Sequence, residues 1–189
     1  MTATDPPAGY TLLRLADQPS SAHAAARKFC LDTIKEFYGF DYRREWHVDL
    51  DSLLLAGAEN HYSAQSRGAF WLLYDAAGAI AGSGGIRHLG WKPNLIEMFT
   101  GRYPHPEEVA SLWRVYVRRD LRGQGLGSWL ARLAEEEAAR MGYDTMYLHA
   151  TSDALATLAF WRSVGYRVIE APPSDSTHFD KLLPQPAVG

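Results

Sequence analysis

The sequence predicts an α/β (α+β) fold in which helices flank a mixed β-sheet. Three observations support this prediction. Short strand-like runs alternate with amphipathic helical runs along the 189 residues. Hydrophobic residues make up 47% of the chain and charged residues 22%, as in globular proteins with a buried core. The chain shows no internal repeat and no linker-like segment, so we expect residues 1–189 to form a single domain.

A strand and a long helix open the predicted fold. Tyr10–Leu15 (Y-T-L-L-R-L) is strand-like, and Ser20–Tyr38 begins with a capping serine and carries apolar residues at helical spacing. Leu50–Leu55 is expected to form a short second helix. His47–Asp51 (H-V-D-L-D) alternates metal-ligating residue types, but three ligands do not complete a metal site. We therefore interpret its aspartates as caps of that helix and predict no metal.

A β-hairpin and an irregular segment come next. The strands Phe70–Tyr74 and Ala79–Leu89 are joined by a D-A-A-G turn. Within the second strand, Gly82–Gly85 (G-S-G-G) predicts a bend or a bulge. Gly90–Glu108 contains three prolines and no clear periodicity. It is the longest irregular connection and therefore a candidate substrate-side loop.

The second half of the chain alternates strands and helices. The apolar residues from Leu126 to Met141 recur at helical spacing along one face, and Gly142 is placed to end that helix. We expect the tail, Pro184–Gly189, to be loose. The predicted elements are, in order, a strand at Leu112–Val117, a helix at Ser128–Met141, a strand at Thr145–Ala150, a helix at Ala154–Ser163, and strands at Tyr166–Glu170 and His178–Leu183.

The segment Arg122–Gly127 (R-G-Q-G-L-G) lies between a predicted strand and a predicted helix. A glycine-rich turn at a helix N-terminus presents free backbone N–H groups, which together with the helix dipole favour a phosphate or pyrophosphate. The turn lacks the lysine of a Walker A loop, and its G-x-G-x-G spacing differs from the dinucleotide fingerprint. The alternative is a tight structural turn without a ligand, flanked by solvated arginines.

Composition excludes several functional classes. The net charge of −3 and the absence of a basic and aromatic stripe argue against nucleic-acid and anionic-membrane partners. No segment is long and apolar enough to span a bilayer, and the first residues lack the pattern of an export signal. The single cysteine, Cys30, lies among apolar neighbours and is interpreted as a core residue. We therefore expect a cytoplasmic protein.

Two segments resemble the GNAT acetyltransferase superfamily. Leu112–Leu130 (L-W-R-V-Y-V-R-R-D-L-R-G-Q-G-L-G-S-W-L) is similar to the family's strand, R/Q-x-x-G-x-G/A turn and helix, and Ala159–Tyr166 (A-F-W-R-S-V-G-Y) to its downstream helix. The similarity is good over Ser111–Glu170. It implies a mostly antiparallel sheet with splayed central strands, and acetyl-CoA-dependent transfer of an acetyl group to a primary amine of a small molecule or peptide. The alternative is a non-catalytic acyl-CoA-binding sensor of the same fold.

The resemblance also implies which residues bind acetyl-CoA. Val115, Tyr116 and Val117 occupy the place of the strand whose backbone pairs with the pantetheine arm. Arg122 would add a charge-assisted contact to the pyrophosphate. The backbone N–H groups that would hold the pyrophosphate belong to Gly123, Gln124, Gly125, Leu126, Gly127 and Ser128.

The candidate catalytic residues are Glu108, Tyr116 and Trp161. The family often places a tyrosine that protonates the leaving thiolate where this chain has Trp161, whose indole is not a general acid and could instead flank the pantetheine. Tyr116, Tyr166 or water could replace that tyrosine. Where many relatives carry a glutamate base, this chain has Ser111. The other candidate bases are Glu107, Glu108, His88 and His149.

The acceptor pocket is expected to be formed by the first two helices, the Gly90–Glu108 segment and the chain after Glu170. Aromatic residues in these regions suggest an amine with an apolar or aromatic part, although core packing would explain them equally well. Edge-strand pairing into a homodimer is compatible with the pattern. The aromatic residues are Phe37, Tyr38, Trp46, Trp91, Phe99 and Tyr103.

Overall fold

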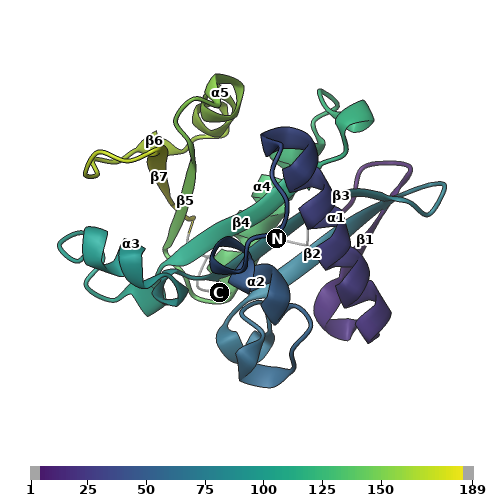
Figure 1. The fold of residues 1–189 in the computed structure, drawn as a ribbon, viewed down its shortest axis with the longest axis horizontal. Coiled ribbons are helices and arrows are strands. Elements are labelled where there is room, and N and C mark those ends of the chain that lie inside the picture. The colour runs from purple at the N-terminus through teal and green to yellow at the C-terminus, as the bar shows by residue number, and fades with distance from the viewer. Residues whose placement is uncertain (1–4, 185–189) are drawn as a thin grey trace.

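The computed structural model describes residues 5–184. Helices flank one seven-stranded sheet (Figure 1). The helices are α1 (Ser20–Tyr38), α2 (Arg44–Ser52), α3 (Pro93–Met98), α4 (Leu126–Arg140) and α5 (Leu155–Ser163). The strands are β1 (Tyr10–Arg14), β2 (Ala69–Asp75), β3 (Ile80–His88), β4 (Ala110–Val117), β5 (Thr145–Thr151), β6 (Arg167–Val168) and β7 (Ser176–Leu182). No helix within 5–184 is long and apolar enough to cross a membrane.

The sheet is mixed and mostly antiparallel, as predicted. Its strand order is β1-β2-β3-β4-β5-β7-β6, and the β4–β5 pair is parallel while every other pair is antiparallel. The β4–β5 pairing is limited to Ala110 with Met146 and Ser111 with Tyr147. Beyond these two pairs the strands diverge, and Figure 1 shows β5 leaving β4 towards α5. The expected splay of the central strands is therefore confirmed.

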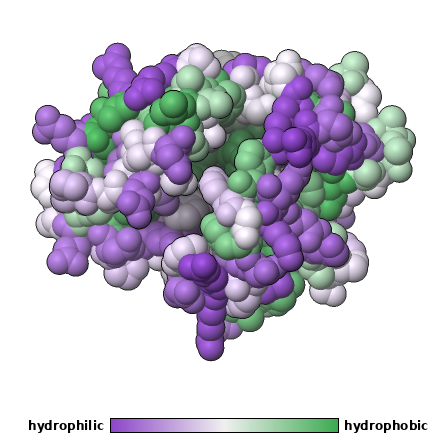
Figure 2. All heavy atoms as spheres, turned by 45° about the horizontal axis from the view of Figure 1, so that its top comes forward, coloured by the Kyte–Doolittle hydropathy of each residue, from purple (hydrophilic) through white to green (hydrophobic). Residues whose placement is uncertain are grey.

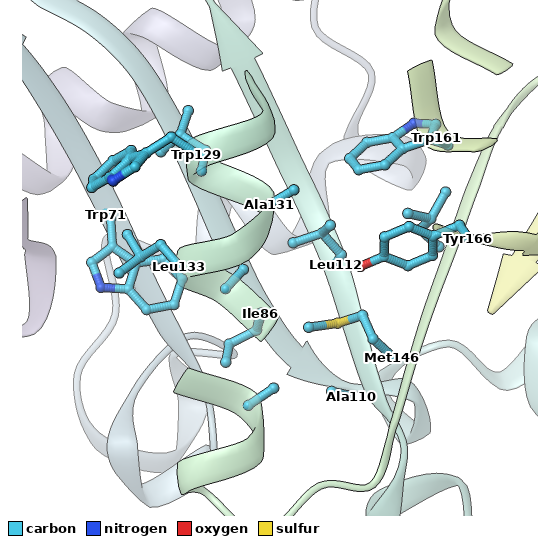
Figure 3. Close-up of a cluster of buried hydrophobic side chains, with 14 of the residues drawn as sticks. Trp71, Ile86, Ala110, Leu112, Trp129, Ala131, Leu133, Met146, Trp161 and Tyr166 are labelled. Carbon is cyan, nitrogen blue, oxygen red and sulfur yellow. The ribbon is translucent and has the colours of Figure 1, made fainter. Parts of the chain in front are cut away.

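The helices form a layer on each face of the sheet. Side chains of a strand alternate between its two faces, so Trp71 and Leu73 on β2 pack with α4, whereas Phe70 and Leu72 pack with α1 and α2. Figure 1 shows α1 and α2 in front of the sheet and α4 behind it. Figure 3 shows the α4 side of the core, where Trp129 and Leu133 lie against the sheet. Cys30 belongs to the core on the α1 side, as predicted.

A bulge interrupts the β3–β4 ladder. The register shifts between Ser83 and Gly85, where the sequence predicted an irregularity. The extra residue, however, lies on β4, because one residue of β3 faces both Arg114 and Val115. Arg114 has a φ of 54°, an uncommon left-handed conformation for a side chain of this size. The bulge puts Trp113 and Tyr116 on the α1 side of the sheet.

Two predicted segments differ from the observed ones. The short helix predicted at Leu50–Leu55 is instead α2, which begins at Arg44 and ends at Ser52. The interpretation of the aspartates in His47–Asp51 as caps is wrong, because they lie inside α2. Residues 44–52 show little apolar periodicity, and buried polar contacts of Asp49 replace the usual hydrophobic face.

The predicted loop Gly90–Glu108 contains α3. Pro93 opens this helix at a position where its missing N–H costs nothing. The last two strands also differ from the predicted ones. β6 has two residues where five were predicted, and β7 begins at Ser176, two residues before the predicted start. The prediction of a loose tail falls, apart from Pro184, outside the described residues.

Candidate functional site

The divergence of β4 and β5 opens a cavity of about 580 Å³. β4, β5 and α5 supply one side of its lining, and the end of α1 and the start of α2 supply the other. The space-filling view shows a hollow with hydrophobic residues at its base and mostly hydrophilic residues around it, in the region between α5 and α1 (Figure 2). Such a mostly apolar cavity with a few convergent polar groups is typical of a small-molecule site.

Within residues 5–184, no strand pairs with the edge of β4 that faces this cavity beyond Ser111. On its other edge, Tyr116 and Val117 pair with Ser83 and Gly82 of β3. The cavity side of Val115, Tyr116 and Val117 is therefore free to bond an extended ligand through backbone groups, in the way that strands accept peptides. That these three residues bind the pantetheine arm stays a prediction.

The glycine turn follows β4 after one short helical turn, Arg119–Leu121. Gly123 and Gly125 have φ values of 76° and 81°, and a Cβ on either would meet no atom within 4 Å. Gly125 is the residue before α4, and its carbonyl accepts the first bond of the helix from Trp129. Within residues 5–184 no backbone carbonyl accepts from the N–H groups of Gly123, Gln124 or Gly125. The turn is thus an open cradle of donors at a helix N-terminus.

The four arginines around the turn differ in their partners. Arg114 binds Asp49, and Arg118 binds Asp75 and Asp120. Arg119 lies 3.7 Å from Glu36. Arg122 donates from Nε to the Val117 carbonyl, 3.1 Å away, and its guanidinium lies 3.9 Å from the ring centre of Phe37. Because Arg122 has no carboxylate partner in the described chain, it is the arginine best placed to meet an anion at the turn.

Tyr116 and Trp161 both line the cavity, whereas Glu108 does not. Burial raises the pKa of Tyr116 to about 12, although the positive charge of Arg114 opposes the shift. The phenol therefore keeps its proton at neutral pH. Trp161 is buried above Tyr166, with ring centres 5.4 Å apart, and Figure 3 shows the two rings beside Leu112. Glu108 is exposed in the single helical turn Pro106–Glu108 before β4.

Among the candidate bases, His149 is the one in the cavity lining. Its ring stands edge-on to Trp113, with centres 5.2 Å apart. Burial lowers the pKa of His149 to about 3, and the charges of His178, Lys92 and Arg114 act in the same direction. The imidazole is therefore neutral at neutral pH, and its low pKa makes it a weak base. Glu107 and His88 lie outside the cavity lining.

Sequence reasoning missed the ion pair beneath the cavity. Arg114 donates from Nε and Nη2 to the two carboxylate oxygens of Asp49, at 2.8 and 2.7 Å. The Tyr62 hydroxyl donates to the same carboxylate at 2.7 Å. Burial would raise the pKa of Asp49, but Arg114, Arg87 and Tyr62 together hold it well below its usual range. The one available signal was an acidic residue between two apolar ones, V-D-L, which suggests a buried carboxylate.

The aromatic residues expected around an acceptor divide into two groups. Tyr38 and Trp46 line the cavity, while Phe37 is exposed beside Arg122. Phe99 and Tyr103 belong instead to a separate core cluster. Trp91 stacks on His61 with ring centres 3.9 Å apart. Within the described residues, no group of three His, Cys, Asp or Glu side chains could hold a metal ion.

Comparison with known proteins agrees with this geometry. The model of the acetyltransferase (GNAT) family matches residues 31–166. An uncharacterized N-acetyltransferase of Escherichia coli K12, YjgM, is 28% identical over 112 residues, which are 59% of this chain and 59% of that protein. The L-methionine sulfoximine/L-methionine sulfone acetyltransferase of Pseudomonas paraeruginosa PA7 is 29% identical over 131 residues, or 68% of this chain and 69% of that protein.

Solved structures share the fold at low sequence identity. An acetyltransferase of the GNAT family from Staphylococcus aureus Mu50 has a TM-score of 0.69 and 18% identity, covering 93% of this chain and 99% of that one. The yncA protein of Salmonella typhimurium, solved with its cofactor acetyl-CoA, has a TM-score of 0.66 and 19% identity, covering 95% and 97%. The PaiA N-acetyltransferase of Thermoplasma acidophilum, in complex with coenzyme A, has a TM-score of 0.65 and 14% identity, covering 92% and 98%.

Proposed function

The chain belongs to the acetyltransferase (GNAT) family of acyltransferases, and on that premise we propose that it transfers an acetyl group from acetyl-CoA directly to a primary amine. The observation that carries the proposal is the free edge of β4, which leads into the donor cradle at the start of α4. A strand edge suits the amides of an extended pantetheine arm, and a helix N-terminus suits a pyrophosphate. The cavity between β4 and β5 lies beside both and offers room for an acceptor.

Acetyl-CoA supplies the activated acetyl group as a thioester. On the protein side, Val115, Tyr116 and Val117 offer backbone groups, and the turn offers N–H donors with space for phosphate oxygens. Glycine suits Gly123 and Gly125 because of their left-handed backbone and because a Cβ would narrow the approach of the phosphates. Arg122 stands beside this turn as the charged contact. Trp161 forms an apolar wall of the cavity next to β4 and β5.

The charges around the cavity favour a neutral amine. Lys92 and Arg114 line it, and their positive charges oppose a third, ammonium, charge in the same low-dielectric space. An amine must be neutral to attack a thioester. The proton that the amine loses as the new bond forms passes to solvent, because a pKa of about 3 makes His149 too weak a base to take it. The proposal gives no role to Glu108, which lies outside this cavity.

Tyr116 is the proposed proton donor to the leaving thiolate. It lines the cavity and keeps its proton at neutral pH. The Tyr116→Phe variant should lower kcat by about 10²-fold, within the usual range for general acid catalysis, while acetyl-CoA affinity stays within about 2-fold. Single-turnover kinetics together with calorimetry measure both quantities.

A second substitution tests the same role by rescue. Introducing Trp161→Tyr into the Tyr116→Phe variant places a phenol at another position of the cavity lining, where many family members carry one. At least 10-fold of the lost kcat should return if proton donation is what the first variant lacks. An unchanged kcat in Tyr116→Phe would remove Tyr116 from the mechanism.

We propose a small-molecule amine as the acceptor. The cavity of about 580 Å³ fits a small ligand, and Tyr38 and Trp46 give it apolar walls. The Pseudomonas relative acts, by its name, on L-methionine sulfoximine and L-methionine sulfone. Both are small amines, so these two compounds belong in the first acceptor panel.

The decisive experiment has two steps. Calorimetry with acetyl-CoA should give a 1:1 complex, and release of free thiol should then depend on an amine from the panel. A failure to bind any acyl-CoA would overturn the proposal. Binding without turnover of any amine would favour the second candidate, a non-catalytic acyl-CoA sensor, which the tryptophan at position 161 supports.

A further inference from the structure

Three cations surround the indole ring of Trp113, which lines the cavity. The guanidinium of Arg87 lies 4.1 Å from the ring centre of Trp113, the ammonium of Lys92 lies 4.9 Å from it, and the guanidinium of Arg114 lies 5.7 Å from it. Asp49 is the carboxylate of this group, and Arg114 already holds both of its oxygens. The cavity wall around Trp113 therefore carries an excess of positive charge in a chain whose net charge is −3.

Two of these cations lack a counter-ion in the described chain. Arg87 is 1% exposed, and its Nη1 meets the imidazole Nδ1 of His61 at 2.8 Å. Its Nε and Nη2 are buried without any hydrogen-bond acceptor within residues 5–184. Lys92 is half-buried and forms no ion pair with a described residue. Since buried charges are ordinarily paired, this arrangement points to an absent anion.

Lys92 is the cation that can reach that anion. It lines the cavity, whereas Arg87 lies behind Trp113 and acts through its charge. The other titratable groups that line this space are His47 and His149, whose pKa values are both lowered by burial, the phenols of Tyr38 and Tyr116, and Asp175, which is exposed beside Ser176. Burial and the charges of Arg87 and Arg114 lower the pKa of Lys92, while Asp49 raises it. An anion bound to Lys92 would raise its pKa and so oppose the effects of burial and of the two arginines.

We propose that the acceptor carries a carboxylate, which Lys92 binds while Arg87 and Arg114 strengthen the local positive potential. The inference rests on the proposed acetyl transfer and names its substrate class as an amino acid with an apolar side chain. The cations hold the carboxylate and discourage the ammonium form of the amine. Tyr38 and Trp46 contact the apolar part. A purely structural role, in which Lys92 only stacks on Trp113, is the alternative.

The test uses reaction products, because an N-acetyl group removes the titrating amine from the comparison. N-acetylated leucine, methionine and phenylalanine are each compared with their carboxamides by calorimetry on the full chain saturated with CoA. We expect at least one acid to bind about 10-fold or more tighter than its amide. Lys92→Met should weaken binding of that acid by about 10- to 100-fold, the loss of one charge-assisted hydrogen bond, and leave the amide within about 2-fold.

Two further variants control the measurement. Lys92→Arg keeps the charge and should retain most of the preference for the acid. Lys28→Met removes an exposed lysine that pairs with Asp32 on α1, far from the cavity lining, and should change nothing. Equal binding of acids and amides, an equal loss of both in Lys92→Met, or no binding of any acid would overturn the inference.

Failure of the proposed acetyl transfer can be distinguished from failure of the carboxylate proposal. The first would appear as an absence of acyl-CoA binding or of turnover. The preference for a carboxylate is read from product binding and does not depend on turnover, so a protein that binds products without catalysing the reaction would still test Lys92.

Discussion

Replacing Gly125 with glutamate is expected to weaken acetyl-CoA binding by at least about 100-fold. Gly125 immediately precedes α4, has a φ of 81°, and has no atom within 4 Å of the position of a Cβ. A carboxylate there would occupy the donor cradle and repel the pyrophosphate. It would itself interact favourably with the helix N-terminus and so compete for the N–H groups. Calorimetric titration with acetyl-CoA measures the loss.

The matched control for this substitution is Gly142, at the other end of α4. Its φ is 85° and its Cβ position is equally open, so Gly142→Glu imposes a similar backbone strain far from the turn. Both variants should lose about 1 kcal/mol of unfolding free energy, because an L-residue is strained in this conformation. Only Gly125→Glu should lose acetyl-CoA. Equal affinities in the two variants would mean that the turn binds no pyrophosphate.

The local geometry on which the predicted cofactor side depends could be read from the sequence. The turn at Arg122–Gly127 is local, because glycines, a preceding strand and a following helix define its shape within a short stretch. The same is true of Val115 to Val117, whose role depends on the backbone of a strand. The strand and the glycine turn are contiguous in the sequence, so a short family motif can describe both.

The acceptor side could not be predicted in the same way. Asp49 and Arg114 are separated by 65 residues, and nothing in either segment specifies the other. The β4 bulge shifts the register so that Trp113 and Tyr116 share one face, which strict alternation from Trp113 would not allow. Lys92 reaches the cavity from a segment that sequence reasoning treated as irregular. Long-range contacts and a single extra residue therefore limited the prediction.

Removing the carboxylate of Asp49 is expected to be the most destabilising single change near the site. Its side chain is buried, and Arg114, which is also largely buried, binds both of its oxygens. Asp49→Ala leaves the guanidinium without its counter-ion and the Tyr62 hydroxyl without its acceptor. The expected loss is about 3–5 kcal/mol of unfolding free energy. Asp32→Ala, which breaks the exposed pair with Lys28, should cost less than about 0.5 kcal/mol.

Acidification tests the same ion pair without a mutation. Because the pKa of Asp49 in the folded protein lies below its unfolded value of about 3.9, the stabilisation is fully present above pH 4. It is lost as the pH falls from 4 towards the folded pKa. Urea unfolding of the wild type should therefore show a steep fall in stability below pH 4. Two other carboxylates contribute to the same fall: the backbone N–H of Ala79 and then Arg118 lower the pKa of Asp75, and Arg118 lowers the pKa of Asp120.

A double variant separates the ion pair from these other carboxylates. Asp49→Leu combined with Arg114→Met replaces both charges by apolar side chains of similar length, and such replacements of buried pairs are often neutral or stabilising. The unfolding free energy of the double variant at pH 7 should return to within about 1–2 kcal/mol of the wild-type value. Below pH 4, this free energy should fall less steeply than in the wild type, because Asp49 no longer titrates. If the double variant were as unstable as Asp49→Ala, shape rather than charge at position 114 would be the cause.

The same double variant also tests whether the ion pair positions catalytic groups. Arg114 Nη1 donates to the Tyr116 hydroxyl at 3.4 Å. Recovery of stability without recovery of acetyl transfer would therefore mean that the pair holds Tyr116 and the cavity wall in position.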